Sequence, residues 1–434
     1  MRLRRADTPV GTPILPILAV NFVATLGFSI VLPSLVFVVT RLGGNALVYG
    51  LMGATYSFFQ LFGAPILGRW SDRYGRRRIL LLSVAGTFVS WAIFLVAVGL
   101  PGRPLGDIDS PILGAFTLTV PLVVLFLARA LAGLTGGDVS IANAYLADIS
   151  DERNRSENFG KMAAASNLGF VVGPALAGLL GAAGLGEALP IVAALVISAL
   201  AGLLVAFGLP ESTPCVLGAD PERVNVRKLL GQEHKECFSM HAARKFSMAE
   251  ILKLPSMKLL LAVYFLVFLA FNLFYVAFPV YAATGIRWSL GEIGIYFSVM
   301  SLMMALVQGP VLKRLSKRWS DRTLVLGGSI LLAASFPFFA ATSAGLIYGG
   351  TALLAVGNGL MWPSLLAMLS AMTDKTVQGA VQGFASSTGA VASIAGLLLG
   401  GVLYESLGNR VFLISAVLIA LSFGLSFMIP AKHK

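Results

Sequence analysis

Long runs of apolar residues, separated by short polar segments, dominate this sequence. A helix needs about 20 consecutive apolar residues to cross the hydrocarbon core of a bilayer. Twelve such runs are found, at 14–40, 46–68, 79–100, 112–147, 157–184, 187–209, 257–284, 290–312, 323–343, 346–372, 376–404 and 409–430. They predict an all-α integral membrane protein with twelve transmembrane helices.

The composition agrees with a bilayer as the solvent. Of the 434 residues, 57% are hydrophobic and 12% are charged, whereas a soluble domain carries about 25% charged residues. The first apolar run is too long for a cleaved signal peptide, so we expect it to be the first membrane helix.

The positive charges fall mainly on one side of the predicted spans. If both termini are cytoplasmic, that side receives the basic clusters 69–78 and 313–322, and the outer loops keep only Arg41, Arg103, Arg287 and Arg410. This asymmetry follows the positive-inside rule and accounts for the net charge of +12. Because the cations lie between apolar runs, we expect no nucleic-acid partner.

The polar segment 211–256 divides the spans into six and six. The pattern of Pro65–Tyr74 recurs at Pro310–Trp319, at the end of the second span of each half. Parallel repeats of this kind relate two bundles by an axis along the membrane normal. We predict two pseudo-symmetric six-helix halves, with an N-terminal bundle at 1–210, a cytoplasmic linker at 211–256 and a C-terminal bundle at 257–434.

The connection between the second and third spans carries Gly68, Asp72, Arg73, Gly75, Arg76 and Arg77. We expect Gly68 to permit close helix approach, Gly75 to turn the chain, and the arginines to hold that turn on the cytoplasmic side. The motif resembles the signature of the major facilitator superfamily, which implies the major facilitator fold. The resemblance also implies a cytoplasmic gate, in which Asp72 faces the start of the eleventh helix and Arg73 meets Asp148 or Asp151.

The fifth span places four residues, Gly169, Gly173, Pro174 and Gly178, at intervals near one helical turn. Small residues at this spacing let membrane helices approach closely, so an ordinary helix contact is one interpretation. The residues are also similar to the antiporter motif of drug/proton exchangers in the superfamily. The segments Ala144–Asp151 and Asn158–Gly160 resemble the tetracycline/proton antiporter branch, which favours export.

Two ionisable residues lie within the fourth predicted span. Arg129 begins a run similar to the superfamily motif whose buried arginine is associated with proton coupling; hydrogen bonding to backbone carbonyls is the alternative. Asp138 is the one carboxylate well inside a span, and an intramembrane acid is a candidate for binding a proton or a cation. The alternative is a neutral aspartic acid that stabilises the bundle. On an ideal helix the two residues face nearly opposite directions, unless Gly136 and Gly137 distort it.

Other polar residues within the spans are candidates for a substrate pathway, namely Asn21, Gln60, Asn143, Asn167, Asn272, Gln308 and Asn358. Each can equally form a hydrogen bond between helices. The first span has no carboxylate, whereas the antiporter branch carries one there, so Asp138 is the candidate to replace it.

The resemblance implies a secondary transporter that exports amphipathic small molecules or drugs in exchange for protons, by alternating access to one central pathway. A proton-coupled importer or uniporter of a small metabolite would use the same fold, and a nontransporting membrane receptor is a further alternative. We expect a monomer in a bacterial plasma membrane, with no enzymatic activity, no cofactor and no metal site. Cys215 and Cys237 lie in the linker and form no metal-ligand pattern.

Overall fold

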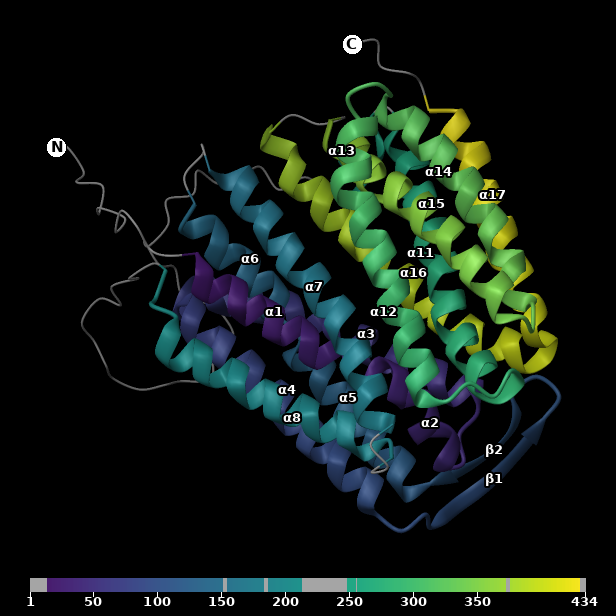
Figure 1. The fold of residues 1–434 in the computed structure, drawn as a ribbon. Coiled ribbons are helices and arrows are strands. Elements are labelled where there is room, and N and C mark those ends of the chain that lie inside the picture. The colour runs from purple at the N-terminus through teal and green to yellow at the C-terminus, as the bar shows by residue number, and fades with distance from the viewer. Residues whose placement is uncertain are drawn as a thin grey trace.

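The computed structural model describes residues 14–150, 154–182, 186–212, 248–254, 256–371 and 375–429, and these are mostly helical (Figure 1). The helices before the linker are α1 (Leu15–Ser29), α2 (Leu32–Arg41), α3 (Ala46–Tyr74), α4 (Arg76–Gly99), α5 (Val120–Thr135), α6 (Asp138–Asp148), α7 (Arg155–Ala182) and α8 (Ala188–Leu203). A π-helical turn at Leu204–Gly208 extends α8.

The remaining helices are α10 (Met248–Leu252), α11 (Met257–Val280), α12 (Leu290–Leu306), α13 (Leu312–Leu315), α14 (Asp321–Ser335), α15 (Ala344–Ala371), α16 (Lys375–Leu407) and α17 (Val411–Phe427). Tyr281–Gly285 and Val307–Val311 are π-helical turns, and Phe336–Ala340 and Gly408–Arg410 are 3₁₀ turns. The helix α10 falls within the predicted linker, most of which lies outside the described residues.

Ten segments of the described residues are long and apolar enough to cross a membrane. One of them, Phe384–Phe427, contains both α17 and most of α16, and α3 is a further helix of 29 residues that carries charges at its end. The structure therefore confirms a helical membrane protein and is consistent with the twelve predicted spans.

Two predicted spans are each built from two helices. The first span breaks at Ile30–Val31, just before Pro33, which occupies the first turn of α2, where a missing backbone N–H costs least. The fourth breaks at Gly136 and Gly137, between α5 and α6. The distortion that the two glycines allow is thus present, and Asp138 starts a new helix.

The predicted start of the fourth span at residue 112 is wrong. The strands β1 (Pro104–Ser110) and β2 (Gly114–Thr119) form an antiparallel hairpin, and α5 begins only at Val120. The hairpin covers the turn between α2 and α3, since the N–H of Thr117 donates to the carbonyl of Gly43 at 2.9 Å. A short apolar run could not be told from the start of a helix by its composition.

The helices form two groups, one before and one after the linker, that meet near the hairpin and spread apart toward the opposite end (Figure 1). Across the groups, α12 packs along α7 and α16 packs along α3. Backbones come close at these contacts: a methyl group added at Gly294 of α12 would lie 2.5 Å from the carbonyl oxygen of Pro174 in α7. One added at Gly401 of α16 would lie 2.6 Å from the Cα of Leu47 in α3.

Aromatic side chains pack the core of the second group. Phe274 of α11 lies with its ring centroid 4.7 Å from that of Phe339 and 5.3 Å from that of Phe278. All three side chains are fully buried. Stacked and edge-to-face rings of this kind stabilise helix packing beyond their buried area.

Candidate functional site

A cavity of about 680 Å³ lies between the two groups of helices. The first group contributes Phe28, Tyr56 and Phe170 to its wall, and the second contributes Phe268, Tyr275 and Trp362. Phe268 and Trp362 pack edge to face with centroids 5.0 Å apart. This size and this mainly apolar wall suit a small organic molecule.

Four of the seven predicted pathway residues line the cavity: Asn167, Asn272, Gln308 and Asn358. The amide of Asn272 donates to the carbonyl of Phe268 at 2.8 Å and to the hydroxyl of Ser393 at 3.1 Å. The wall thus combines aromatic surface with a few polar groups from both halves.

The other three pathway candidates lie outside the cavity lining. Asn21 is buried, and its amide joins α1 to α7 by donating to the Met162 carbonyl at 3.2 Å and the Ser166 hydroxyl at 2.6 Å. The hydrogen-bonding interpretation holds for this residue. Asn143 is half-buried on α6.

Gln60 supports the break between α5 and α6. Its amide donates to the carbonyl of Gly136 at 3.1 Å and to the Tyr56 hydroxyl at 3.0 Å. A broken membrane helix leaves backbone groups without partners, so a side chain that binds one of them stabilises the break. Gln60 therefore links the break to a residue of the cavity wall.

Arg129 lines the cavity and is 5% exposed. Its guanidinium lies over the rings of Trp91 and Phe94, at 5.6 and 5.7 Å from their centroids. The nitrogen Nε is buried without a hydrogen-bond partner among the described residues. The alternative of hydrogen bonding to backbone carbonyls is therefore not seen for this nitrogen, and the cation interacts mainly with aromatic faces.

Asp138 lies at the first turn of α6, half-buried and outside the cavity lining. No ion pair between Asp138 and Arg129 is found in the described part of the chain. Tyr56 is within electrostatic range of both residues. Tyr56 lines the cavity, and Gln60 joins its hydroxyl to the carbonyl of Gly136, two residues before Asp138.

Tyr49 and Tyr56 are cavity residues that the sequence analysis missed. They are seven positions apart in α3 and therefore share one face of the helix. Their spacing was the available signal, but aromatic residues of a membrane helix also face lipid.

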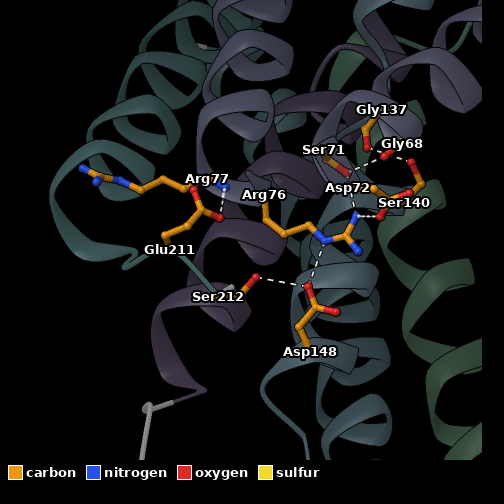
Figure 2. Close-up of polar contacts among 10 residues, drawn as sticks. All are labelled: Gly68, Ser71, Asp72, Arg76, Arg77, Gly137, Ser140, Asp148, Glu211 and Ser212. Atoms are coloured by element: carbon orange, nitrogen blue, oxygen red, sulfur yellow. Dashed lines mark hydrogen bonds and ion pairs between the residues drawn. The ribbon is translucent and has the colours of Figure 1, made fainter. Parts of the chain in front are cut away.

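The motif at the turn between α3 and α4 forms a polar cluster (Figure 2). Arg76 lies at its centre, with Nε 2.9 Å from the carboxylate of Asp148 and Nη1 2.5 Å from that of Asp72. Nη1 also donates to the hydroxyl of Ser71 at 2.7 Å. Arg76 thus joins the end of α3 to the end of α6, while Asp151 lies outside the described residues.

The same cluster extends to the segment after α8. The Ser212 hydroxyl donates to Asp148 at 3.1 Å, and the backbone N–H of Arg77 donates to Glu211 at 3.2 Å (Figure 2). Gly75 has φ +100°, which confirms the expected turn, because residues other than glycine rarely adopt that conformation.

The expected close approach at Gly68 is wrong in this structure. A methyl group added there would meet no atom within 4 Å, whereas one added at Gly63 would meet the carbonyl of Gly133 at 2.8 Å. Helix α3 therefore makes its close contact with α5 at Gly63, about one and a half helical turns before Gly68.

The glycines of α7 make contacts in two directions. A methyl group added at Gly169 would lie 2.9 Å from Thr25 of α1, and Gly173 faces Ser29, whose hydroxyl donates to the Gly169 carbonyl at 2.9 Å. Gly178 instead faces Gly291 of α12, in the other half. Both interpretations of the motif require such close approach, and part of it lies at the contact between the halves.

Glu405 of α16 crosses between the halves near the hairpin. Its carboxylate accepts a hydrogen bond from the backbone N–H of Ala46, at the first turn of α3, at 2.8 Å. It also lies against Gly114, which has φ +72° at the hairpin tip. A carboxylate at a helix N-terminus is favourably placed, so Glu405 stabilises this contact.

Comparison with known proteins identifies relatives along the whole chain. The family model described as Major Facilitator Superfamily matches residues 17–306 and 260–434. Tetracycline resistance protein, class C, of Escherichia coli is 28% identical over 87% of this chain and 85% of its own length. Multidrug resistance protein 1 of Bacillus subtilis is 26% identical over 95% of both chains.

Solved structures share the fold. The human organic anion transporter MFSD10 is 22% identical, with a TM-score of 0.63, and the match covers 95% of this chain and 98% of that one. A bacterial homologue of the iron transporter ferroportin is 17% identical, with a TM-score of 0.71 and coverage of 95% and 97%. The family match and the arrangement of helices agree, and this chain belongs to the major facilitator superfamily.

Proposed function

We propose that this protein exports amphipathic small molecules in exchange for protons, by alternating access to the cavity between its halves. The observation that carries the proposal is the position of the cavity, whose wall is shared by helices before and after the linker. Rocking of one bundle against the other would then expose the same site to either side of the membrane. Relatives named for tetracycline and multidrug resistance support export rather than import.

In this proposal the present state is open toward the cytoplasm. The contacts between the halves at Gly294, Gly401 and Glu405 lie at the hairpin end. At the opposite end, the two groups of helices spread apart (Figure 1). The positive-inside rule supports placing that end, with the turn between α3 and α4, in the cytoplasm.

In this proposal the Arg76 cluster belongs to the cytoplasmic gate. It holds the ends of α3, α4 and α6 together as one unit in the N-terminal half, through Asp72 and Asp148. When the cavity opens to the outside, Asp72 of this unit would face the start of α16, and Arg73 would meet Asp148 or Asp151. The proposal includes a division into bundles at 1–210 and 257–434, joined by the linker at 211–256. It also includes a monomer in a bacterial plasma membrane, with both termini in the cytoplasm.

Asp138 is the proposed proton carrier, with Arg129 as the cation that responds to its charge. Asp138 lies at a helix break, where water and side chains can replace backbone partners. Through Gln60, the cavity residue Tyr56 is joined to the Gly136 carbonyl, two residues before Asp138, so proton binding can influence substrate binding without direct contact.

The test is proton flux in proteoliposomes of the purified protein, with a pH-sensitive dye inside and tetracycline, ethidium or 1-naphthaleneacetate added outside. We expect substrate-triggered alkalinisation of an acidic lumen. Asp138→Asn should reduce this flux at least tenfold, while Ser140→Ala, two residues along the same helix, should keep it.

Undiminished proton flux in a folded Asp138→Asn variant would remove the role of Asp138. Equilibration of radiolabelled substrate without proton flux in the wild type would identify a uniporter instead. Absence of transport for every probe, with the protein shown to be folded, would favour a receptor.

A further inference from the structure

The cavity carries one sign of charge. Among the described residues that line it, Arg129 is the only charged side chain, and none is an aspartate or a glutamate. The remaining polar groups of the lining are amides and hydroxyls, such as those of Asn167, Gln308 and Asn358. Those groups bind ions of either sign and do not neutralise the guanidinium.

Arg129 is buried, and no ion pair to it is found among the residues that the structure describes. Its side chain is 5% exposed, and in the described part of the chain its Nε has no hydrogen-bond partner. The phenol-bearing residues Tyr49 and Tyr56 line the same cavity. A buried cation is costly unless it is paired, so the side chain retains capacity for an anion.

Aromatic rings cannot replace that anion. Trp91 and Phe94 lie on the guanidinium at 5.6 and 5.7 Å, and cation–π contact leaves the in-plane N–H donors of an arginine available. A planar guanidinium matches the two oxygens of a carboxylate or the oxygens of a sulfonate. Because Arg129 lines the cavity, its positive charge favours a ligand group that carries negative charge and accepts hydrogen bonds.

The opposite wall can hold an apolar body. Tyr264, Phe268 and Trp362 pack together, with the ring centroids of Tyr264 and Trp362 5.0 Å apart, and Phe268 and Trp362 line the cavity. Tyr275 and Phe297 lie parallel, with centroids 6.3 Å apart. The positive group thus lies on the N-terminal half, while aromatic surface is available on the C-terminal half as well as on the N-terminal one.

We propose that the cavity binds amphipathic organic anions, with a carboxylate or sulfonate on Arg129 and an aromatic body against Phe268 and Trp362. This inference rests on the proposed transport function and assigns its substrate class. It places the ligand across both halves, so binding of the anion couples the two bundles. Organic cations of the same shape meet an unneutralised positive charge and bind weakly.

The experiment measures equilibrium binding to the protein in lipid nanodiscs at neutral pH, without any gradient. Three probes share one ring system and differ in charge: 1-naphthaleneacetate, 1-naphthaleneacetamide and 1-naphthylmethylammonium. The wild type should bind the anion at least tenfold more tightly than the ammonium. Arg129→Gln should weaken binding of the anion at least tenfold and leave binding of the acetamide within twofold. Arg129→Lys should retain part of the preference.

Arg322→Gln is the matched control. Arg322 also lies over an aromatic ring, 5.5 Å from the centroid of Phe427, and donates to the Phe427 carbonyl at 2.6 Å, but it does not line the cavity. This variant should leave all three affinities unchanged. Retained acetamide binding and a single size-exclusion peak establish that Arg129→Gln is folded.

Equal or tighter binding of the ammonium by the wild type would overturn the inference, and so would an equal loss of all three probes in Arg129→Lys. If Arg129→Gln does not fold, the inference is tested by the preference of the wild type for the anion over the ammonium and by the affinities of Arg129→Lys. Because no gradient is present, a failure of proton coupling in the Asp138 experiment would leave these binding results intact. The two proposals therefore fail separately.

Discussion

The two ends of the molecule are held together in different ways. At the hairpin end, glycines bring backbones of opposite halves into contact, as at Gly294 against Pro174 and Gly401 against Leu47. At the other end, charged side chains join helices of one half, through Arg76 and Asp148. Close backbone packing depends on shape, whereas ion pairs can exchange partners when helices move.

This difference suggests how the halves alternate. Opening the hairpin end must separate tightly packed glycines and the hydrogen bond of Glu405 with Ala46. Closing the opposite end requires only that an assembled polar cluster meets a new surface. The interactions that stabilise the state closed at the hairpin end therefore lie mainly at that end. Substitutions there should have larger effects on transport than substitutions at the opposite end.

Gly294→Val should produce the largest change. The added side chain would collide with the Pro174 carbonyl, 2.5 Å from the first added carbon, and with the Cα of Gly178 at 2.8 Å. Overpacking of this kind costs about 1–3 kcal/mol, so we expect the halves to separate at this end and transport to fall at least tenfold. Initial rates in proteoliposomes measure the effect.

Gly349→Val in α15 is the control for that variant, because an added methyl there meets nothing within 4 Å. Its rate should stay within twofold of the wild type. If Gly294→Val transports normally, the glycine contact does not close the hairpin end.

Glu405→Gln should have an intermediate effect. The charged acceptor at the first turn of α3 becomes neutral, and the hydrogen bond to the Ala46 N–H weakens. Hydrogen bonds to charged groups contribute about 1.5–3 kcal/mol, so losing part of one should raise the population open at the hairpin end several-fold. The measurement is the labelling rate of a cysteine that replaces Leu35 in the cavity wall. The thiol reagent is added from the hairpin side, so the rate reports how often that end is open.

Glu292→Gln provides a comparison at the same end of the molecule. Glu292 caps its own helix, α12, whereas Glu405 binds the start of a helix in the other half. Labelling of Leu35→Cys should not increase in this background. An equal increase in both variants would indicate a general loosening instead.

Arg76→Gln should have the smallest effect in the present state. It removes the ion pairs with Asp72 and Asp148, but both join helices of one half, so no contact between the halves is lost. We expect transport to fall a few-fold, because the cluster no longer holds α3 to α6 when the gate closes. The exposed Arg78 gives a matched control in Arg78→Gln, and equal rates in the two variants would contradict the gate role.

The sequence predicted the membrane class and most helix positions because apolar length alone determines them. It also identified Arg129, Asn167 and Asn358, since polar residues are conspicuous inside apolar runs. Tyr49 and Tyr56 were missed because an aromatic side chain in a membrane helix suits lipid as well as a cavity. Glu405 was missed because a carboxylate near a span boundary is ordinary, and only the folded structure brings it to Ala46.

The central claim is that the two ends open in alternation, and pulsed electron spin resonance between spin labels tests it directly. One pair, at Lys161 and Trp319, spans the halves at the gate end, and the other, at Val96 and Leu346, spans them at the hairpin end, with Cys215 and Cys237 replaced by serine. In nanodiscs, Gly294→Val should shorten the first distance and lengthen the second. If both distances stay fixed, or both lengthen together, the halves do not alternate and the account is wrong.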